Sequence, residues 1–138
     1  MTPRVTRRAR RGARWLPALA WMAGIAYLSH QTRPLGAAGS DIEAAVAHLT
    51  LYAILAFALY WPLAPDAPTP GWLPASFAFA LAVLFGVTDE LHHALVPGRV
   101  ASTTDLALDG AGALLGVVAA LVVSGVLRQL QPHSGPNP

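Results

Sequence analysis

The apolar residues of this chain occur in four blocks, separated by stretches rich in proline, glycine and polar residues. The blocks cover residues 15–29, 44–61, 72–88 and 106–127. A helix that is apolar on all sides is either a membrane span or a deeply buried core helix. Four such helices in 138 residues leave no outer layer of chain to bury them. The pattern therefore predicts an all-α polytopic membrane bundle of four transmembrane helices.

Prolines mark the expected helix boundaries. Pro17 and Pro74 fall in the first turn of their helices, where a missing N–H does little harm. Pro62 is expected to end the second helix. The first block is shorter than the roughly 20 residues that cross a bilayer. To span the membrane, its helix would have to continue toward Gln31 at one end, while the Arg14 side chain snorkels to the interface at the other. A cleaved signal peptide is the alternative for this block, although no A-x-A-like cleavage site follows it.

Composition supports a lipid environment. Hydrophobic residues make up 54% of the chain and charged residues 12%, whereas a soluble domain carries about 25% charged residues. The absence of cysteine excludes disulfides and thiolate metal sites. We expect three regions: a basic cytoplasmic arm (1–14), the membrane domain (15–127) and a disordered cytoplasmic tail (128–138), which is rich in proline and polar residues.

The arginines predict the orientation. All nine basic residues are arginine, and six fall within the first fourteen positions. A basic arm can bind nucleic acid, but directly before a hydrophobic block it is better interpreted as a cytoplasmic anchor. With both termini in the cytoplasm, seven arginines lie inside and two, Arg33 and Arg99, lie outside. Six of the seven acids then gather at the outer face: Asp41, Glu43, Asp89, Glu90, Asp105 and Asp109.

The candidate chemistry lies between residues 88 and 116. Asp89 and Glu90 precede His93 by four and three residues, so the three share one helical face. Arg99 follows the turn at residues 97–98. Ser102 with an acid three residues later predicts a capping box that opens the fourth helix. A further stripe comprises Asp105, Asp109, Gly112 and Gly116, and its glycines predict close approach of another helix.

The second block adds His48 and Tyr52, four residues apart on one face. An unpaired carboxylate at the depth of Asp109 would cost on the order of 2.5–3.5 kcal/mol, so His48 and Arg99 are its expected partners. We therefore predict that these groups converge with Asp89, Glu90 and His93 in one outward-opening polar pocket. The alternative for the acids is an interfacial ion pair with Arg99, worth roughly 0–1 kcal/mol.

These residues resemble the VanZ-like family, whose pattern is close to D-E-x-x-Q-x-x-x-P-G-R and then D-x-x-x-N-x-x-G-x-x-x-G. The matching positions are Asp89, Glu90, Pro97, Gly98, Arg99, Asp105, Gly112 and Gly116. The family's histidine four residues before a tyrosine matches His48 and Tyr52, and Ser29 is similar to a serine near the end of the first span. The resemblance covers roughly residues 15–127.

The chain departs from the family pattern in three places. His93 stands where glutamine is usual, Asp109 stands where asparagine is usual, and residues 44–45 are Ala-Ala instead of Asp-Lys. The resemblance implies a multi-pass plasma-membrane protein of a family associated with low-level resistance to the glycopeptide teicoplanin. That antibiotic acts outside the membrane on cell-wall precursors, which is the side of the predicted pocket.

Three functions remain open from the sequence. The first is non-enzymatic binding of a lipid-linked or anionic envelope component, or of an envelope protein. The binding residues would be Arg99, His48, Tyr52, Asp105 and Asp109.

The second is a small intramembrane enzyme. Asp89 or Glu90 would be the general base, His93 the acid/base group and Arg99 an anion clamp. No G-x-S-x-G nucleophile pattern supports it. The third is a proton or ion conduit, although the inner half of the blocks offers few polar groups.

We expect no cofactor and no metal. The E-x-H-H run around His92 and His93 is not an established ligand spacing. Adjacent histidines also point about 100° apart on a helix. His30 is expected to be solvated.

Overall fold

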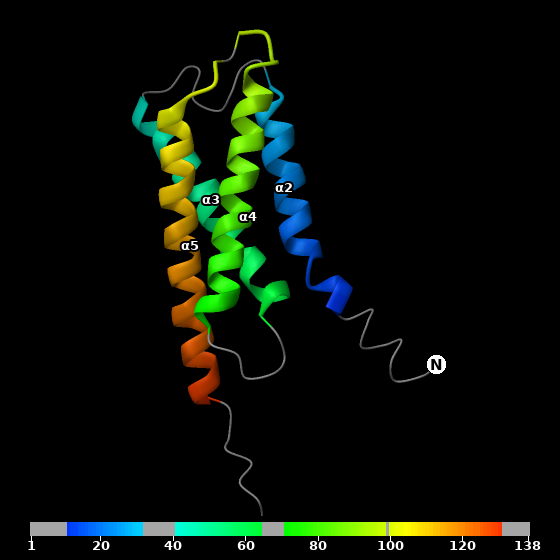
Figure 1. Cartoon of the computed structure of the whole chain (residues 1–138), viewed down its shortest axis with the longest axis vertical. Helices are drawn as coiled ribbons and strands as arrows, with labels where there is room; N and C mark the ends of the chain where they lie inside the picture. The colour runs from blue at the N-terminus through cyan, green and yellow to red at the C-terminus, as the bar shows by residue number, and fades with distance from the viewer. Residues whose placement is uncertain (1–10, 32–40, 65–70, 99, 131–138) are drawn as a thin grey trace, which may run out of the picture.

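The computed structural model describes residues 11–31, 41–64, 71–98 and 100–130. Its bundle is built from α2 (Leu16–Ser29), α3 (Asp41–Leu63), α4 (Trp72–His93) and α5 (Thr103–Leu130). The described residues contain no strand. Successive helices run in opposite directions, so α2 begins and α5 ends at the same end of the bundle (Figure 1).

Three of these helices are long and apolar enough to cross a membrane. Among the described residues these are α3, α4 and α5, with 23, 22 and 28 residues. Helix α2 has 14 residues, about 21 Å at 1.5 Å per residue, which is shorter than a hydrocarbon core of about 30 Å. The chain is therefore an all-helical membrane protein with three candidate spans, and a crossing by α2 stays a prediction.

Two helices, α3 and α5, have bounds that differ from those expected. Helix α3 begins at Asp41 and passes through Pro62 to Leu63, so the prediction that Pro62 ends the helix was wrong. A proline this close to a helix end removes one backbone hydrogen bond and leaves the earlier turns intact. Helix α5 begins at Thr103 and continues to Leu130, beyond its apolar block on both sides.

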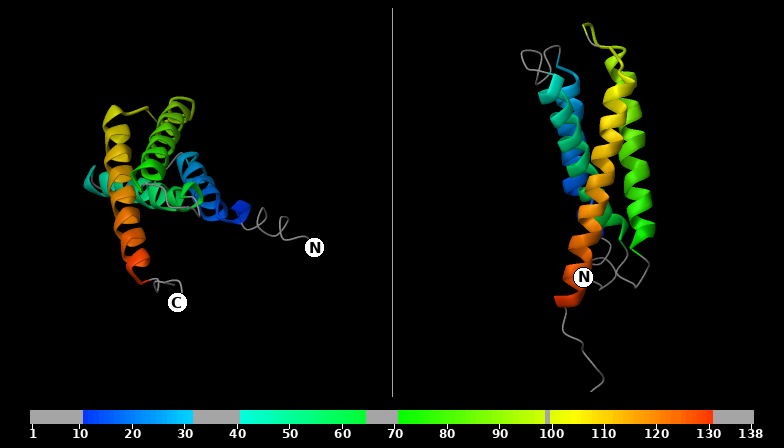
Figure 2. Two further views of the ribbon diagram at one scale, coloured as in Figure 1. Left: turned by 60° about the horizontal axis from the view of Figure 1, so that its bottom comes forward. Right: turned by 90° about the vertical axis from the view of Figure 1, so that its left-hand side faces the viewer.

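The closest helix pairing is between α3 and α5. A Cβ atom on Gly112 would collide with the backbone carbonyl oxygen of Leu49, and one on Gly116 with that of Ala53. The absence of side chains at these two glycines lets the backbones approach. Helix α5 also packs against α4, whereas α2 contacts α3 and α4 on the side away from α5 (Figure 2).

The core lies mainly between α3, α4 and α5, and α2 adds Ala18 and Ile25 to it. Its largest fully buried side chains are Tyr52, Leu55, Tyr60 and Asp109. Small residues such as Ala78 and Ala82 on α4 complete it. Large apolar residues remain exposed along all four helices, as expected for surfaces whose solvent is lipid.

Candidate functional site

Most of the described polar contacts between helices gather at one end of the bundle. We call this the polar end: the end at which α2 and α4 finish and α3 and α5 begin, uppermost in Figure 1. Its polar residues are Ser29, His30, His48, Tyr52, Asp89, Glu90, His92, His93, Ser102, Asp105 and Asp109. Six of them are less than one-tenth exposed and carry ionisable or hydroxyl groups: Ser29, Tyr52, Asp89, Glu90, His93 and Asp109.

A chain of hydrogen bonds centred on His93 joins three segments. Its Nδ1 atom lies 2.9 Å from Oε1 of Glu90, and its Nε2 atom lies 2.5 Å from Oγ of Ser29. An ionised carboxylate can only accept, so Nδ1 carries the proton and Nε2 of a neutral ring accepts from the Ser29 hydroxyl. The second oxygen of Glu90 accepts the backbone N–H of Ser102 at 2.6 Å. The chain therefore ties α2 and α4 to the start of α5.

One half of the expected capping box forms between Ser102 and Asp105, and Glu90 on α4 completes the other half. The backbone N–H of Asp105 donates to Oγ of Ser102 at 3.1 Å. Ser102 precedes the helix, and the side-chain oxygen of such a residue typically accepts a backbone N–H of the first turn. The backbone N–H of Ser102 bonds to Glu90 instead of the side chain of Asp105. Glu90 on α4 thus supplies the reciprocal half of the cap, which fixes the position of α5 relative to α4.

A second cluster lies between α3 and α5. Nδ1 of His48 is 2.8 Å from Oδ1 of Asp109, and Nε2 of His48 is 4.0 Å from Oδ2 of Asp105. Asp109 is fully buried, and its Oδ2 atom has no hydrogen-bond partner among the described residues. Gly86 on α4 makes room for that oxygen, because a Cβ atom there would lie 3.1 Å from it.

Tyr52 lies between the two clusters. Its hydroxyl donates to Oδ2 of Asp89 at 3.5 Å, and its ring, like the Asp109 carboxylate, lies beside Gly86. Oδ2 of Asp89 is also 3.8 Å from Nε2 of His93. The predicted groups therefore gather at one end of the bundle as two linked clusters. Arg99, the expected anion-binding group, lies outside the described residues.

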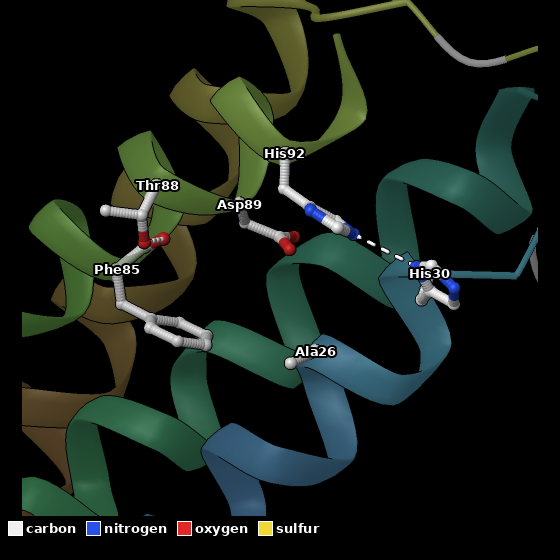
Figure 3. A pocket seen from close by; sticks show the side chains of 6 residues that line it. All are labelled: Ala26, His30, Phe85, Thr88, Asp89 and His92. Carbon is white, nitrogen blue, oxygen red and sulfur yellow. Dashed lines mark hydrogen bonds between the residues drawn. The ribbon is translucent and has the colours of Figure 1, made fainter. Parts of the chain in front are cut away.

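A pocket of about 270 Å³ opens between α2 and α4. Its lining comprises Ala26, His30, Phe85, Thr88, Asp89 and His92. Asp89, His92 and Phe85 project from α4 toward α2, where Ala26 and His30 lie (Figure 3). Nδ1 of His30 is 3.4 Å from Nε2 of His92. The sequence analysis gave no role to this histidine pair, since nothing in the spacing indicates that the two residues meet.

Ser29 was noted in the sequence only as a position similar to a family serine. Its contact with His93 joins residues 64 positions apart, and no local pattern reports such a pair. His92 and His93 point in different directions: His92 faces the pocket, and His93 faces Ser29 and Glu90.

Three buried side chains at the polar end are spaced so that they could hold a metal ion. Asp89, Glu90 and His93 each offer one ligand atom, and these three atoms lie within 4.8 Å of one another.

The family model described as VanZ/LLP1 matches residues 14–124. Comparisons with curated proteins and with solved structures gave no match. The matched range contains the helices α2, α3 and α4, most of α5, and every residue of the polar end. The chain therefore belongs to the VanZ/LLP1 family.

Proposed function

We propose that this VanZ-type membrane protein binds the head group of a lipid-linked envelope component in the pocket between α2 and α4. The distribution of the pocket's lining residues carries the proposal. His30, Asp89 and His92 lie at the polar end. Ala26 and Phe85 each precede one of these residues by four positions, about one helical turn deeper. A polar rim above an apolar wall suits an amphiphile that enters from the bilayer.

The size and chemistry of the pocket indicate which part of a lipid it would hold. Its volume of about 270 Å³ is just below the roughly 300–1,000 Å³ of common ligand sites, so a head group fits while the acyl chains stay in the bilayer. The carboxylate of Asp89 and the imidazoles of His30 and His92 favour hydroxyl or amino groups, which sugars and peptides supply. Recognition of an anionic group rests on Arg99, outside the described residues.

The proposal places this pocket at the outer face of the plasma membrane. The support is the excess of arginine in the first fourteen residues and the positive-inside rule. Lipid-linked cell-wall precursors are displayed on that side, and the family's association with teicoplanin resistance concerns the same compartment. A role in glycopeptide tolerance would follow from binding such a precursor or an envelope protein beside it.

The pocket can be tested by filling it. Ala26→Trp places an indole in the pocket, and Ala107→Trp places one on an exposed face of α5, at the same end of the bundle. Native mass spectrometry of protein extracted in mild detergent should show a lipid adduct on the wild type and on Ala107→Trp, but not on Ala26→Trp. Equal adducts on both variants would contradict the proposal, as would a wild type without any adduct.

The hydrogen-bond chain through His93 supports a second candidate, an acyl-transfer enzyme. Ser29, His93 and Glu90 have the order and contacts of a nucleophile, a base and an orienting acid. The Ser29 oxygen would attack an ester carbonyl while His93 takes its proton. The expelled alcohol would take that proton back, and water would release the acyl group. This candidate ranks second because Ser29 is 4% exposed and does not line the pocket.

A fluorophosphonate separates the two candidates, because it forms a stable bond only with an activated serine. If Ser29 is a nucleophile, intact protein gains one adduct at Ser29, with loss of fluoride, and His93→Gln prevents it. Ser124→Ala, at another buried serine, should leave that adduct in place. Absence of labelling at Ser29 in wild-type protein that binds lipid would exclude the enzyme and leave the binding function.

A further inference from the structure

The last turns of α4 carry three potential metal ligands on one buried face. Asp89 and Glu90 precede His93 by four and three residues, and one ligand atom from each lies within 4.8 Å of the other two. Oδ2 of Asp89 is 3.8 Å from Nε2 of His93, and Oε1 of Glu90 is 2.9 Å from Nδ1 of His93. Ligands of a tetrahedral zinc ion lie about 3.3–3.6 Å apart. Small side-chain rotations would therefore close this group around one ion.

The spacing of Glu90 and His93 is one that helical bundles use to bind metal ions. In di-iron and di-manganese bundles, Glu-x-x-His motifs project from their helices into the core. Glu90 and His93 have the same spacing and are 6% and 2% exposed, so they also project into the bundle. The sequence analysis expected no metal because it considered the adjacent pair His92 and His93, whereas this group needs only His93.

The hydrogen bonds of His93 are compatible with an ion. An imidazole binds a metal through one nitrogen, and the other nitrogen usually keeps a hydrogen bond that orients the ring. Ser29 lies beside Nε2 and Glu90 beside Nδ1, so either choice leaves the second nitrogen with a partner. Glu90 is itself oriented by the backbone N–H of Ser102, which donates to its Oε2 atom.

The charges of the polar end also favour a cation. Asp89 and Glu90 are both buried, and the ion-pair partner of each among the described residues is the same histidine, His93. Oδ2 of Asp109, a third buried acid at this end, has no hydrogen-bond partner among the described residues. Buried carboxylates are costly unless they are paired or bind a metal. A divalent ion would compensate two of these charges at once.

We propose that Asp89, Glu90 and His93 bind one divalent transition-metal ion of the Zn²⁺ or Mn²⁺ type inside the polar end. The imidazole favours a transition metal over Mg²⁺ and Ca²⁺, and the two carboxylates match its charge. Three protein ligands leave a coordination position open. The hydroxyl groups of Ser29 on α2 and Tyr52 on α3 flank the group, because they contact His93 and Asp89.

The ion would deepen the proposed function, and this step rests on that function. Asp89 belongs to the group and also lines the pocket, so the ion and a bound head group would be neighbours. The open coordination position would bind an anionic oxygen of the head group, such as that of a phosphate. The same ion would occupy His93 and Glu90, which the serine mechanism needs as base and orienting acid. Metal binding and acyl transfer are therefore alternatives.

Zn²⁺ titration of the full chain, purified in detergent without a histidine tag and stripped with a chelator, tests the site. We expect one Zn²⁺ per chain by calorimetry, and visible absorption bands typical of a coordinated ion when Co²⁺ replaces zinc. His93→Gln should weaken binding by more than the roughly 10–100-fold that loss of an outer-shell partner costs. His92→Ala removes the neighbouring histidine, which faces the pocket, and should bind Zn²⁺ as the wild type does.

Thermal unfolding shows whether each variant is folded before metal is added. Zn²⁺ should then raise the unfolding temperature of the wild type and of His92→Ala, but not that of His93→Gln, because only a bound ion stabilises the folded state. Glu90→Gln is the second test. Its amide oxygen can still accept the Ser102 N–H, so this variant should keep the helix cap and lose the metal.

Two outcomes would overturn the site. In one, the wild type binds Zn²⁺ no more tightly than His93→Gln and Glu90→Gln do. In the other, binding survives in His93→Gln and disappears in the double variant His30→Ala/His92→Ala, which would move the ion to the mouth of the pocket.

Native mass spectrometry with and without Zn²⁺ separates the metal site from the proposed function. Metal bound with no change in the lipid adduct would keep the site and remove its role in head-group binding. Metal bound by a protein that shows no lipid adduct would contradict the proposed function alone.

Discussion

Nδ1 of His48 and Oδ1 of Asp109 lie 2.8 Å apart and join α3 to α5 at the polar end. Asp109 is fully buried, at a depth where an unpaired carboxylate costs on the order of 2.5–3.5 kcal/mol on insertion scales. The histidine, 61 residues earlier in the chain, is the partner that makes this position tolerable. The contact therefore contributes to the register of α5 against α3.

Removing either partner should destabilise the bundle. Asp109→Ala leaves the partly buried His48 ring without its acceptor, and loss of such a hydrogen-bond partner costs about 1–3 kcal/mol. Asp109→Asn keeps a carbonyl oxygen for the ring and should cost less. Thermal unfolding in detergent measures both. An Asp109→Asn variant as unstable as Asp109→Ala would show that the charge, and not the hydrogen bond, sustains the contact.

The glycines of α5 offer a matched comparison. Gly116→Ala should destabilise the protein, because even a methyl group collides with the backbone of Ala53. Gly110→Ala on the same helix meets nothing within 4 Å and should stabilise it by roughly 0.5–1 kcal/mol, the usual gain over glycine in a helix. Chemical denaturation in detergent gives both values. Equal effects of the two substitutions would show that α3 and α5 do not approach at Gly116.

The contact between Ser29 and His93 should hold α2 against α4. Ser29→Ala leaves a buried ring nitrogen without its donor, which costs about 1–3 kcal/mol. Ser76→Ala is the control, because the exposed Ser76 hydroxyl bonds within its own helix to Trp72 and should change stability by less than about 0.5 kcal/mol. Thermal unfolding compares them. A Ser29→Ala protein as stable as Ser76→Ala would mean that α2 is held by apolar contacts alone.

Much of the helical architecture could be predicted from the sequence. The four apolar blocks correspond to α2, α3, α4 and α5, because apolar runs between proline and glycine leave the backbone few alternatives in lipid. The spacing of Asp89, Glu90 and His93 also placed them on one face, where two of them form a hydrogen bond. These inferences depend only on local geometry along a single helix.

The contacts between helices could not be predicted in the same way. Helix α2 is apolar on nearly every side, so its sequence does not indicate which residues face α4. Only the rotation of α2 decides that Ser29 meets His93 and that His30 meets His92. The same holds for Glu90, whose bond to Ser102 depends on where α5 starts beside α4. In place of the single predicted pocket, the structure has two linked clusters and a pocket between α2 and α4 that shares Asp89 with them.

The account depends above all on the polar end facing the outside, and thiol labelling tests this directly because the chain contains no cysteine. Val100 lies near the polar end and is 84% exposed, and Leu130 lies at the opposite end and is 72% exposed. Gly12, also exposed, precedes α2. Each is replaced in turn by cysteine, and intact cells are treated with a membrane-impermeant maleimide, with lysed cells as the control.

We predict that Val100→Cys is labelled in intact cells, whereas Leu130→Cys and Gly12→Cys are labelled only after lysis. Labelling of Gly12→Cys from outside would show that α2 does not cross the membrane, and would reduce the spans to three. Labelling of Leu130→Cys from outside, with Val100→Cys protected, would place the pocket in the cytoplasm and contradict the proposed function.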